Sequence, residues 1–266
     1  MSSFPYLTVT IASPLVGVAG IALLPRGLAR RSKEIALGAS LLTLALTILD
    51  TVKFSVSGAQ SSTGRFQLTE SYTWIGQFHI NWAVGVDGIA LVLILMTAVL
   101  VPVVLLASWH DDKDTPRAFF SLMLVLEVMM VGVFAATDVF MFYVFFEALL
   151  IPSYFLIGSY GRSGERHRSY AAVKFLLYNL LGGLLMLAAV IGFYVVSTRS
   201  ISGGSFDFQT LSSAVAHGTI KMSPVTERWL FLGFFVAFAI KAPLVPFHTW
   251  LPDAGAEAPA GGAALL

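Results

Sequence analysis

Residues 228–252 read RWLFLGFFVAFAIKAPLVPFHTWLP, and this stretch decides the class of fold. It begins as an apolar helix and is then interrupted by Pro243 and Pro246. Each proline removes a backbone hydrogen bond and pushes against the carbonyl four residues earlier, here Ala239 and Ala242. A helix broken in mid-membrane is tolerated only where it is buried in protein or lines a watery cavity. We therefore predict a discontinuous membrane helix with freed carbonyls beside its lysine. A merely kinked structural helix is the alternative.

The composition of the whole chain agrees with a membrane protein. Of its 266 residues 57% are hydrophobic and only 12% are charged, and the mean hydropathy is +0.82. A helix needs roughly 20 apolar residues to cross the hydrocarbon core of a bilayer. We predict an all-α polytopic membrane protein with about seven spans, the first of them retained rather than cleaved as a signal peptide. The predicted spans are 7–24, 35–53, 86–109, 118–136, 139–158, 170–197 and 228–251.

Positive charge is divided unevenly between two sets of loops. One set contains Arg26, Arg30, Arg31, Lys33, Lys113, Arg117, Arg162, Arg166 and Arg168. The other holds Arg65, Arg199 and Lys221. Because loops rich in lysine and arginine stay in the cytoplasm, we predict a multi-pass protein of the cell inner (plasma) membrane with its N-terminus outside the cytoplasm. On the outer face we expect short strands or a hairpin within 54–81 and a short surface helix near 211–216.

Ionisable side chains occur where a membrane makes them costly. Glu127, Glu147 and Lys241 fall near the centres of spans four, five and seven, where a charge costs about 2.5–3.5 kcal/mol on insertion scales. Such residues usually carry function. One alternative is that Glu147 and Lys241 form a static ion pair. Another is that Glu127 is protonated or is hydrogen-bonded to a neighbouring helix. Lys174, alone, is a snorkelling lysine at the interface. His248 either caps the broken helix or relays protons.

The chain contains no cysteine, which excludes disulfides, iron–sulfur ligation by this chain and thiolate zinc sites. Four of the five histidines fall in predicted loops or at helix ends, so we predict no haem held by paired membrane histidines. No nucleotide-binding glycine loop occurs. We predict no cofactor or metal site in this chain, and no nucleic-acid partner.

Four motifs resemble one known family. They are VDGIA at 86–90, FFEALLIPSY at 145–154, KAPLVPFHTWLPDA at 241–254 and EAP at 257–259. Together they resemble the antiporter-like subunits of respiratory complex I, the proton-translocating NADH–quinone oxidoreductase, and among these subunit M (chain 4 in mitochondria). The resemblance implies a fold of two inverted five-helix repeats, each with a discontinuous helix. We expect residues 1–117 to form the first three helices with their outer loop, and 118–266 to form part of one repeat.

The resemblance also implies roles for single residues. Glu147 corresponds to the family's essential span-five glutamate, Lys241 to the lysine of the broken helix and Lys174 to the span-six lysine. His248 falls in the family's histidine-threonine-tryptophan segment, and Glu127 is a further possible proton site. The expected function is proton translocation in the membrane arm, coupled to quinone reduction through the Glu147–Lys241 pair. Flavin and iron–sulfur clusters are expected in other subunits, and the partners are other membrane-arm subunits, lipid and protons.

Three alternatives to this reading remain open. The chain ends before the family's second repeat, so we expect a fragment, or else a partner chain that completes the channel. Multisubunit cation/proton antiporters and hydrogenase membrane arms share the motifs. Finally, the buried charges could serve only to hold a structural spacer together.

Overall fold

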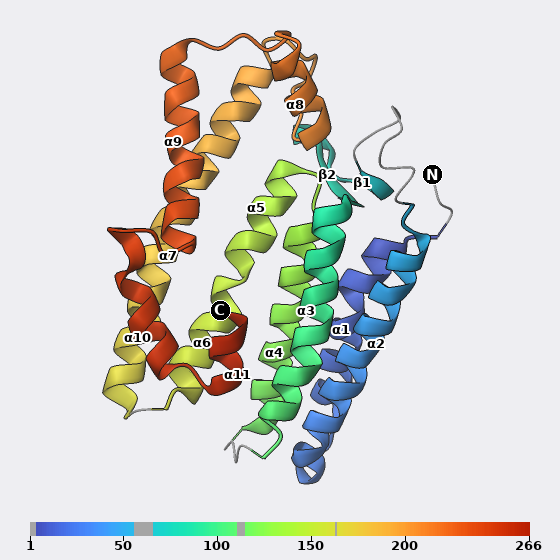
Figure 1. Ribbon diagram of the computed structural model, residues 1–266, viewed down its shortest axis with the longest axis vertical. Coiled ribbons are helices and arrows are strands. Elements are labelled where there is room, and N and C mark those ends of the chain that lie inside the picture. The colour runs from blue at the N-terminus through green and yellow to red at the C-terminus, as the bar shows by residue number, and fades with distance from the viewer. Residues whose placement is uncertain (1–3, 56–65, 111–114, 163) are drawn as a thin grey trace.

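The computed structural model describes residues 4–55, 66–110, 115–162 and 164–266. These residues form long helices that run along one axis, with a small hairpin at one end (Figure 1). The first half of the chain contains α1 (Tyr6–Leu23), η1 (Arg26–Arg31), α2 (Ser32–Lys53), β1 (Gln67–Ile75), η3 (Gly76–Phe78), β2 (Ile80–Val86), α3 (Gly88–Ala107) and α4 (Pro116–Ala135). The second half contains α5 (Val139–Ala148), α6 (Leu150–Tyr160), α7 (Glu165–Ser197), α8 (Phe208–Ala216), α9 (Pro224–Lys241), η4 (Phe247–Thr249), α10 (Trp250–Glu257) and α11 (Ala260–Leu265).

Six helical segments in the described part of the chain are long and apolar enough to cross a membrane. They are α1, η1 with α2, α3, α4, α5 with α6, and α7, and they confirm the first six predicted spans. The seventh, α9, has 18 residues but carries Glu227, Arg228 and Lys241. Its helix stops at Lys241, so the predicted end at 251 is wrong. The helix ends there because Pro243 and Pro246 cannot continue its hydrogen bonding.

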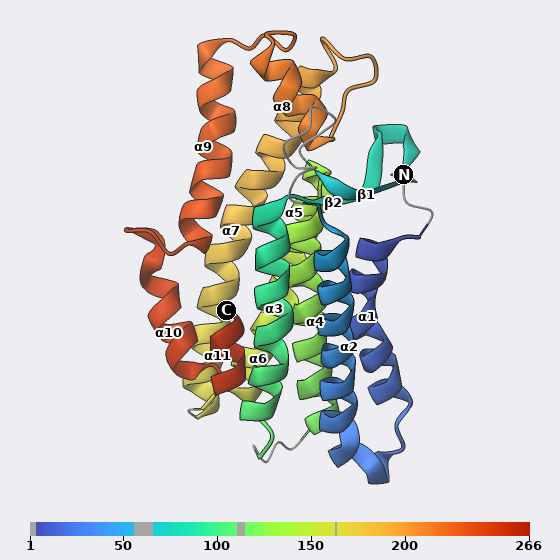
Figure 2. The same ribbon diagram turned by 45° about the vertical axis from the view of Figure 1, so that its right-hand side comes forward.

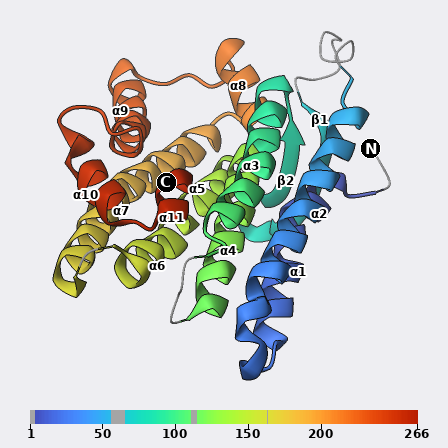
Figure 3. The same ribbon diagram turned by 60° about the horizontal axis from the view of Figure 1, so that its bottom comes forward.

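The helices form two neighbouring groups. Helices α1 to α4 lie together on one side, and α7, α9 and α10 lie on the other, with α5 and α6 between them (Figures 2 and 3). In the first group, Phe119, Met123 and Leu124 of α4 are buried in an apolar cluster shared with α1, α2 and α3. In the second, Phe175 of α7 and Trp250 of α10 are the large buried side chains. The broken helix therefore packs on α7 at the edge of the molecule.

A polar seam joins α1 to α2 inside the first group. The Thr10 hydroxyl donates to the Asp50 carboxylate at 2.7 Å, and the hydroxyls of Ser13 and Thr43 lie 2.8 Å apart. All four side chains are buried. Small polar residues of this kind let membrane helices approach closely and hydrogen-bond across the interface. The seam thus fixes the pairing of the first two spans.

The predicted surface helix is present, and so is the outer hairpin, although its second strand, Ile80–Val86, lies mostly beyond the predicted range 54–81. Strands β1 and β2 pair antiparallel, with Tyr72 opposite Trp82, and α8 covers the predicted helix near 211–216. Both are attached to the link between α4 and α5, where the Thr137 N–H donates to the Ala83 carbonyl at 2.9 Å and the Val139 N–H to Phe206 at 2.8 Å. This link therefore ties the hairpin, α5 and the approach to α8 together.

The two predicted sets of loops lie at opposite ends of the molecule. The connections after α1, α3 and α6 gather at one end, which we call the arginine-rich end, and the hairpin and α8 gather at the other (Figure 1). Arg65 and Lys113 lie outside the described residues. Lys53 and Arg228 add positive charge near the hairpin end, but the excess stays at the arginine-rich end. Which end faces the cytoplasm stays a prediction.

Asp138 caps α5, and its burial leads us to predict that its contribution to stability depends on pH. Its carboxylate, 1% exposed, accepts the N–H groups of Phe140 and Met141 at 2.9 and 3.0 Å. Burial raises the pKa of Asp138 above its usual value, although these backbone donors act against the rise. An acid with a raised folded-state pKa loses stability as pH rises, because the unfolded chain ionises first. We expect Asp138→Asn to gain stability relative to the parent as pH rises from about 4 to about 7.

Thermal unfolding of the chain in detergent at several pH values measures this difference. Asp87→Asn is the matched control, because Asp87 caps α3 by accepting the N–H of Ala90 at 2.9 Å. A fall in the stability of Asp138→Asn relative to the parent as pH rises would contradict the prediction.

Candidate functional site

The break in the seventh predicted span is closed by local hydrogen bonds. The Ala242 N–H donates to Phe238 at 2.7 Å, and the Leu244 N–H donates to the Ala239 carbonyl at 2.8 Å. The expectation of a free carbonyl at Ala239 is therefore wrong, because the turn after Lys241 supplies a new donor. The chain then continues through η4 into α10, which confirms the discontinuous helix (Figure 1).

Trp250 bridges the break. Its indole N–H donates to the Ile240 carbonyl at 2.9 Å, and its ring packs edge-on against Phe175, with the ring centres 5.3 Å apart. The side chain is 2% exposed. Trp250 thus satisfies a carbonyl that the helix end leaves open and anchors both halves of the broken helix to α7. Trp250 belongs to the stretch 228–252 that contains the broken helix, but its spacing there did not predict the contacts with Ile240 and Phe175.

Lys241 lies at the break with two aromatic rings near its ammonium group. Its Nζ is 5.5 Å from the centre of Phe146 on α5 and 5.9 Å from that of Phe175 on α7. Such distances allow cation–π attraction. The side chain is half-buried and interacts electrostatically with Glu147, yet the two form no ion pair within 4.0 Å. The geometry therefore does not show the tight static pair of the alternative reading.

Glu147 occupies a notch in the surface of α7. It is next to last in α5, and the chain makes a turn at Leu149 before α6 begins. Its Oε1 is buried and has no hydrogen-bond partner among the residues that the structure describes. A Cβ added at Gly183 would lie only 1.2 Å from this oxygen. The carboxylate therefore occupies the space that any side chain at 183 would need.

Gly182, the residue before Gly183, faces a different helix. A Cβ at Gly182 would meet the Ile240 side chain at 3.2 Å and the Ala237 backbone at 3.4 Å, both on α9. Gly182 therefore permits close packing of α9 on α7. The pair does more, because Gly183 faces the carboxylate of Glu147. The two glycines thus bring α5 and α9 onto the same turn of α7.

Lys174 has a partner that the sequence did not suggest. Its Nζ lies 2.7 Å from Oδ2 of Asp253 on α10, and one turn further along α7 the Tyr178 hydroxyl accepts from Thr249 at 2.9 Å. Lys174 is also the residue before Phe175, whose ring lies beside Lys241. The side chain is 20% exposed, and its contact with Asp253 joins α7 to α10, the helix that follows the break.

The remaining two sequence candidates lie apart from this group. Glu127 on α4 is fully buried, and neither carboxylate oxygen has a hydrogen-bond partner among the described residues. The hydrogen-bonded alternative for Glu127 is therefore not seen. His248 in η4 is exposed, and its side chain makes no hydrogen bond to the break among the described residues. The structure thus gathers Glu147, Lys241 and Lys174 around α7 and leaves Glu127 and His248 outside.

Known proteins resemble the chain along its whole length. Residues 136–266 match the model of the family described as NADH:quinone oxidoreductase/Mrp antiporter, transmembrane. The chain is 44% identical to NADH-quinone oxidoreductase subunit M of Mycobacterium tuberculosis, covering 100% of this chain and 52% of that protein. It is 34% identical to NADH-ubiquinone oxidoreductase chain 4 of Chondrus crispus, covering 99% and 50%. The chain spans about half the length of these relatives.

A solved structure extends the similarity to the fold. A chain of respiratory complex I from Thermus thermophilus superposes with a TM-score of 0.77 at 30% identity, covering 97% of this chain and 48% of that one. The arrangement of helices described above, including the broken α9–α10, therefore follows an architecture that exists in an assembled membrane complex.

Proposed function

We propose that this chain, of which residues 136–266 match the model of the NADH:quinone oxidoreductase/Mrp antiporter transmembrane family, translocates protons as a membrane-arm subunit of an NADH–quinone oxidoreductase. The membrane in question is the cell inner membrane, with the arginine-rich end in the cytoplasm. The chain itself carries no redox group, and electron transfer from NADH to quinone belongs to other subunits. Membrane-arm subunits of the same complex are its partners.

One observation carries the proposal. Lys241 lies at the helix break with its Nζ 5.5 Å from the ring centre of Phe146, the residue before Glu147, and among the described residues it forms no direct ion pair with Glu147. Paired charges inside a membrane bundle are typical of proton paths, and broken helices form ion sites in transporters. A static pair would gain most from direct contact with hydrogen bonds. The lack of direct contact between the two groups among the described residues instead suits a pair that approaches and parts.

The mechanism is an electrostatic switch. When the Glu147 carboxylate approaches Lys241, its negative charge favours the protonated ammonium. When Glu147 moves away, the ammonium loses its opposite charge inside the helix bundle, and desolvation then favours loss of the proton. The cation–π contacts with Phe146 and Phe175 act against this loss, but they are weaker than the attraction of a nearby carboxylate. The proton leaves toward the hairpin end. Uptake from the arginine-rich end passes Lys174, the neighbour of Phe175 in α7.

Lys174→Ala tests the uptake step. In the assembled full-length complex, reconstituted in liposomes, we expect proton pumping to slow severalfold because the group that passes protons toward Lys241 is missing. Asp253→Asn, which removes the carboxylate 2.7 Å from Lys174, should slow proton pumping less than Lys174→Ala does. Lys33→Ala is the control, since Lys33 lies at the same end and donates to the Trp109 carbonyl. Pumping unchanged by Lys174→Ala would support a snorkelling lysine instead.

A further inference from the structure

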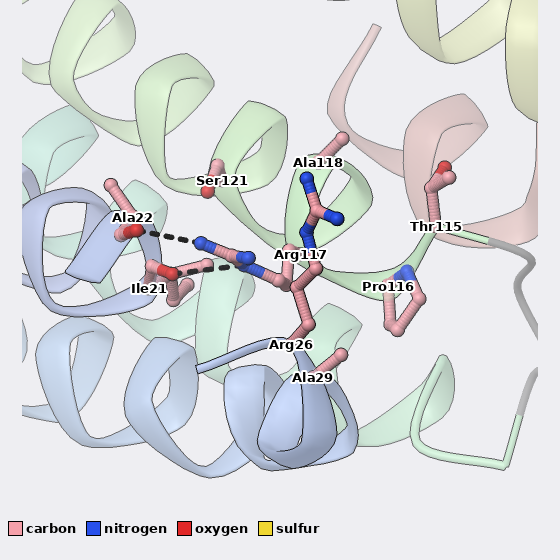
Figure 4. Close-up of a pocket in the computed structure, with 9 residues that line it drawn as sticks. All are labelled: Ile21, Ala22, Arg26, Ala29, Thr115, Pro116, Arg117, Ala118 and Ser121. Carbon is pink, nitrogen blue, oxygen red and sulfur yellow. Dashed lines mark hydrogen bonds between the residues drawn. The ribbon is translucent and has the colours of Figure 1, made fainter. Parts of the chain in front are cut away.

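A pocket of about 620 Å³ opens at the arginine-rich end, away from Glu147 and Lys241. It is bounded by the last turn of α1, by η1 and by the first turn of α4 (Figure 4). Two arginines, Arg26 and Arg117, line it together with Thr115, Ser121 and apolar residues, and no acidic residue is among the lining side chains. The pocket is therefore strongly positive.

Arg117 is fixed in place by the end of α1. Its Nε donates to the Ile21 carbonyl at 3.2 Å and its Nη2 donates to the Ala22 carbonyl at 2.6 Å. These are carbonyls near the C-terminus of a helix, which need partners. A guanidinium has five N–H donors, so others remain for a ligand. Arg117 thus provides a positive charge whose position is already set.

Arg26 supplies the second charge and is held less tightly. It is exposed and lines the same pocket as Arg117, and Figure 4 shows that its guanidinium points away from the Ile21 and Ala22 carbonyls that hold Arg117. Two neighbouring cations repel each other, and a bound anion would remove that repulsion. The first turn of α4 adds N–H groups without partners in the helix, and such groups favour negative charge. All three features suit a phosphate.

The surroundings of the pocket indicate which phosphate. α1 presents an apolar outer face with Val16 67% exposed and Leu23 85% exposed, and Leu23 lies directly after Ala22. A ligand here thus has a charged site at the end of a predicted span and an apolar helix face beside it. Basic pockets between membrane helices on the cytoplasmic side bind anionic lipid headgroups.

We propose that this pocket binds the phosphate of an anionic membrane lipid, with the guanidinium groups of Arg26 and Arg117 on the headgroup and the acyl chains along α1. The site goes beyond proton translocation, and it depends only on the membrane placement of α1 and α4.

Lipid retention measured by native mass spectrometry tests the site. The assembled full-length complex is delipidated in detergent and titrated with dioleoyl phosphatidylglycerol or dioleoyl phosphatidylcholine, and lipid bound to the subunit is counted after its release. We expect preferential retention of phosphatidylglycerol. Arg26→Glu should weaken this retention roughly tenfold, because an attractive charge becomes repulsive. It avoids the Arg117 contacts that hold α1, so loss of folding does not obscure the result.

Arg30→Glu is the matched control, because Arg30 is exposed on η1 and does not line the pocket. Equal loss in Arg26→Glu and Arg30→Glu would overturn the site and indicate a diffuse surface charge. Equal retention of the two lipids would overturn it as well. Displacement of the lipid by millimolar inorganic phosphate alone would show a site for free phosphate and contradict the lipid assignment.

Discussion

Replacement of Lys241 by alanine is expected to lower the number of protons pumped per electron in the assembled complex, while the subunit still assembles. Lys241 is the ionisable residue at the helix break, between the rings of Phe146 and Phe175. A positioned proton-transfer group contributes about 10²- to 10⁴-fold to its step, so alanine should stop transfer through this subunit almost entirely. The fall in the overall ratio then equals the share that this subunit contributes.

The measurement is proton uptake per NADH oxidised in reconstituted liposomes. Lys221→Ala is the matched control, because it removes an exposed lysine from the segment that precedes α9. Lys241→Arg gives a second test: it keeps a positive charge but scarcely releases its proton, and should fail like alanine. A normal proton-to-electron ratio in both Lys241 variants would show that the ammonium does not carry protons.

Replacement of Gly183 by alanine should impair pumping nearly as much, although glycine has no chemistry of its own. The new Cβ would lie 1.2 Å from Oε1 of Glu147 and 2.1 Å from its carboxyl carbon. Since two such atoms cannot overlap, the carboxylate must leave its notch or α7 must shift. Either movement changes the position of Glu147 relative to Lys241. We expect a severalfold lower pumping rate in a complex that still assembles.

Two other glycines separate this effect from a general effect of alanine in a helix. Gly38 lies inside α2 with nothing within 4 Å of an added Cβ, and at Gly182 the nearest atom is the end of the Ile240 side chain at 3.2 Å. Gly38→Ala should therefore be neutral or slightly stabilising, by about 0.5–1 kcal/mol, and Gly182→Ala should be intermediate. Equal pumping in all three variants would contradict a positioning role for Gly183.

The arrangement along the chain could largely be predicted from the sequence. Runs of apolar residues predicted the six spans that the structure contains, and the prolines after Lys241 predicted the discontinuous helix. Alternating aromatic and polar residues gave the outer hairpin. These features depend on local hydrophobicity and backbone chemistry, which neighbouring residues determine. The error at the end of α9 also has a local cause, because the prolines ended the helix earlier than its hydropathy indicated.

The contacts that shape the site could not be predicted in this way. Lys174 and Asp253 are 79 residues apart in sequence, and Glu147 meets Gly183 through the packing of α5 on α7. Pairings at such separations depend on how helices rotate against one another, which hydropathy does not fix. The motif resemblance selected Glu147, Lys241 and Lys174, but it did not indicate Trp250 or Gly183, whose roles come from three-dimensional contacts.

The central claim is that Glu147 and Lys241 together carry protons. Its most direct test is the proton-to-electron ratio of the full-length complex with both Glu147→Gln and Lys241→Ala, reconstituted beside the unchanged complex. Removing both charges leaves neither member of this pair as an unpaired ion in the membrane, so folding is disturbed less than in either single variant. We predict a lowered ratio with normal assembly and continued NADH oxidation. An unchanged ratio in the assembled double variant would contradict the claim and show that the two charges only hold the helices together.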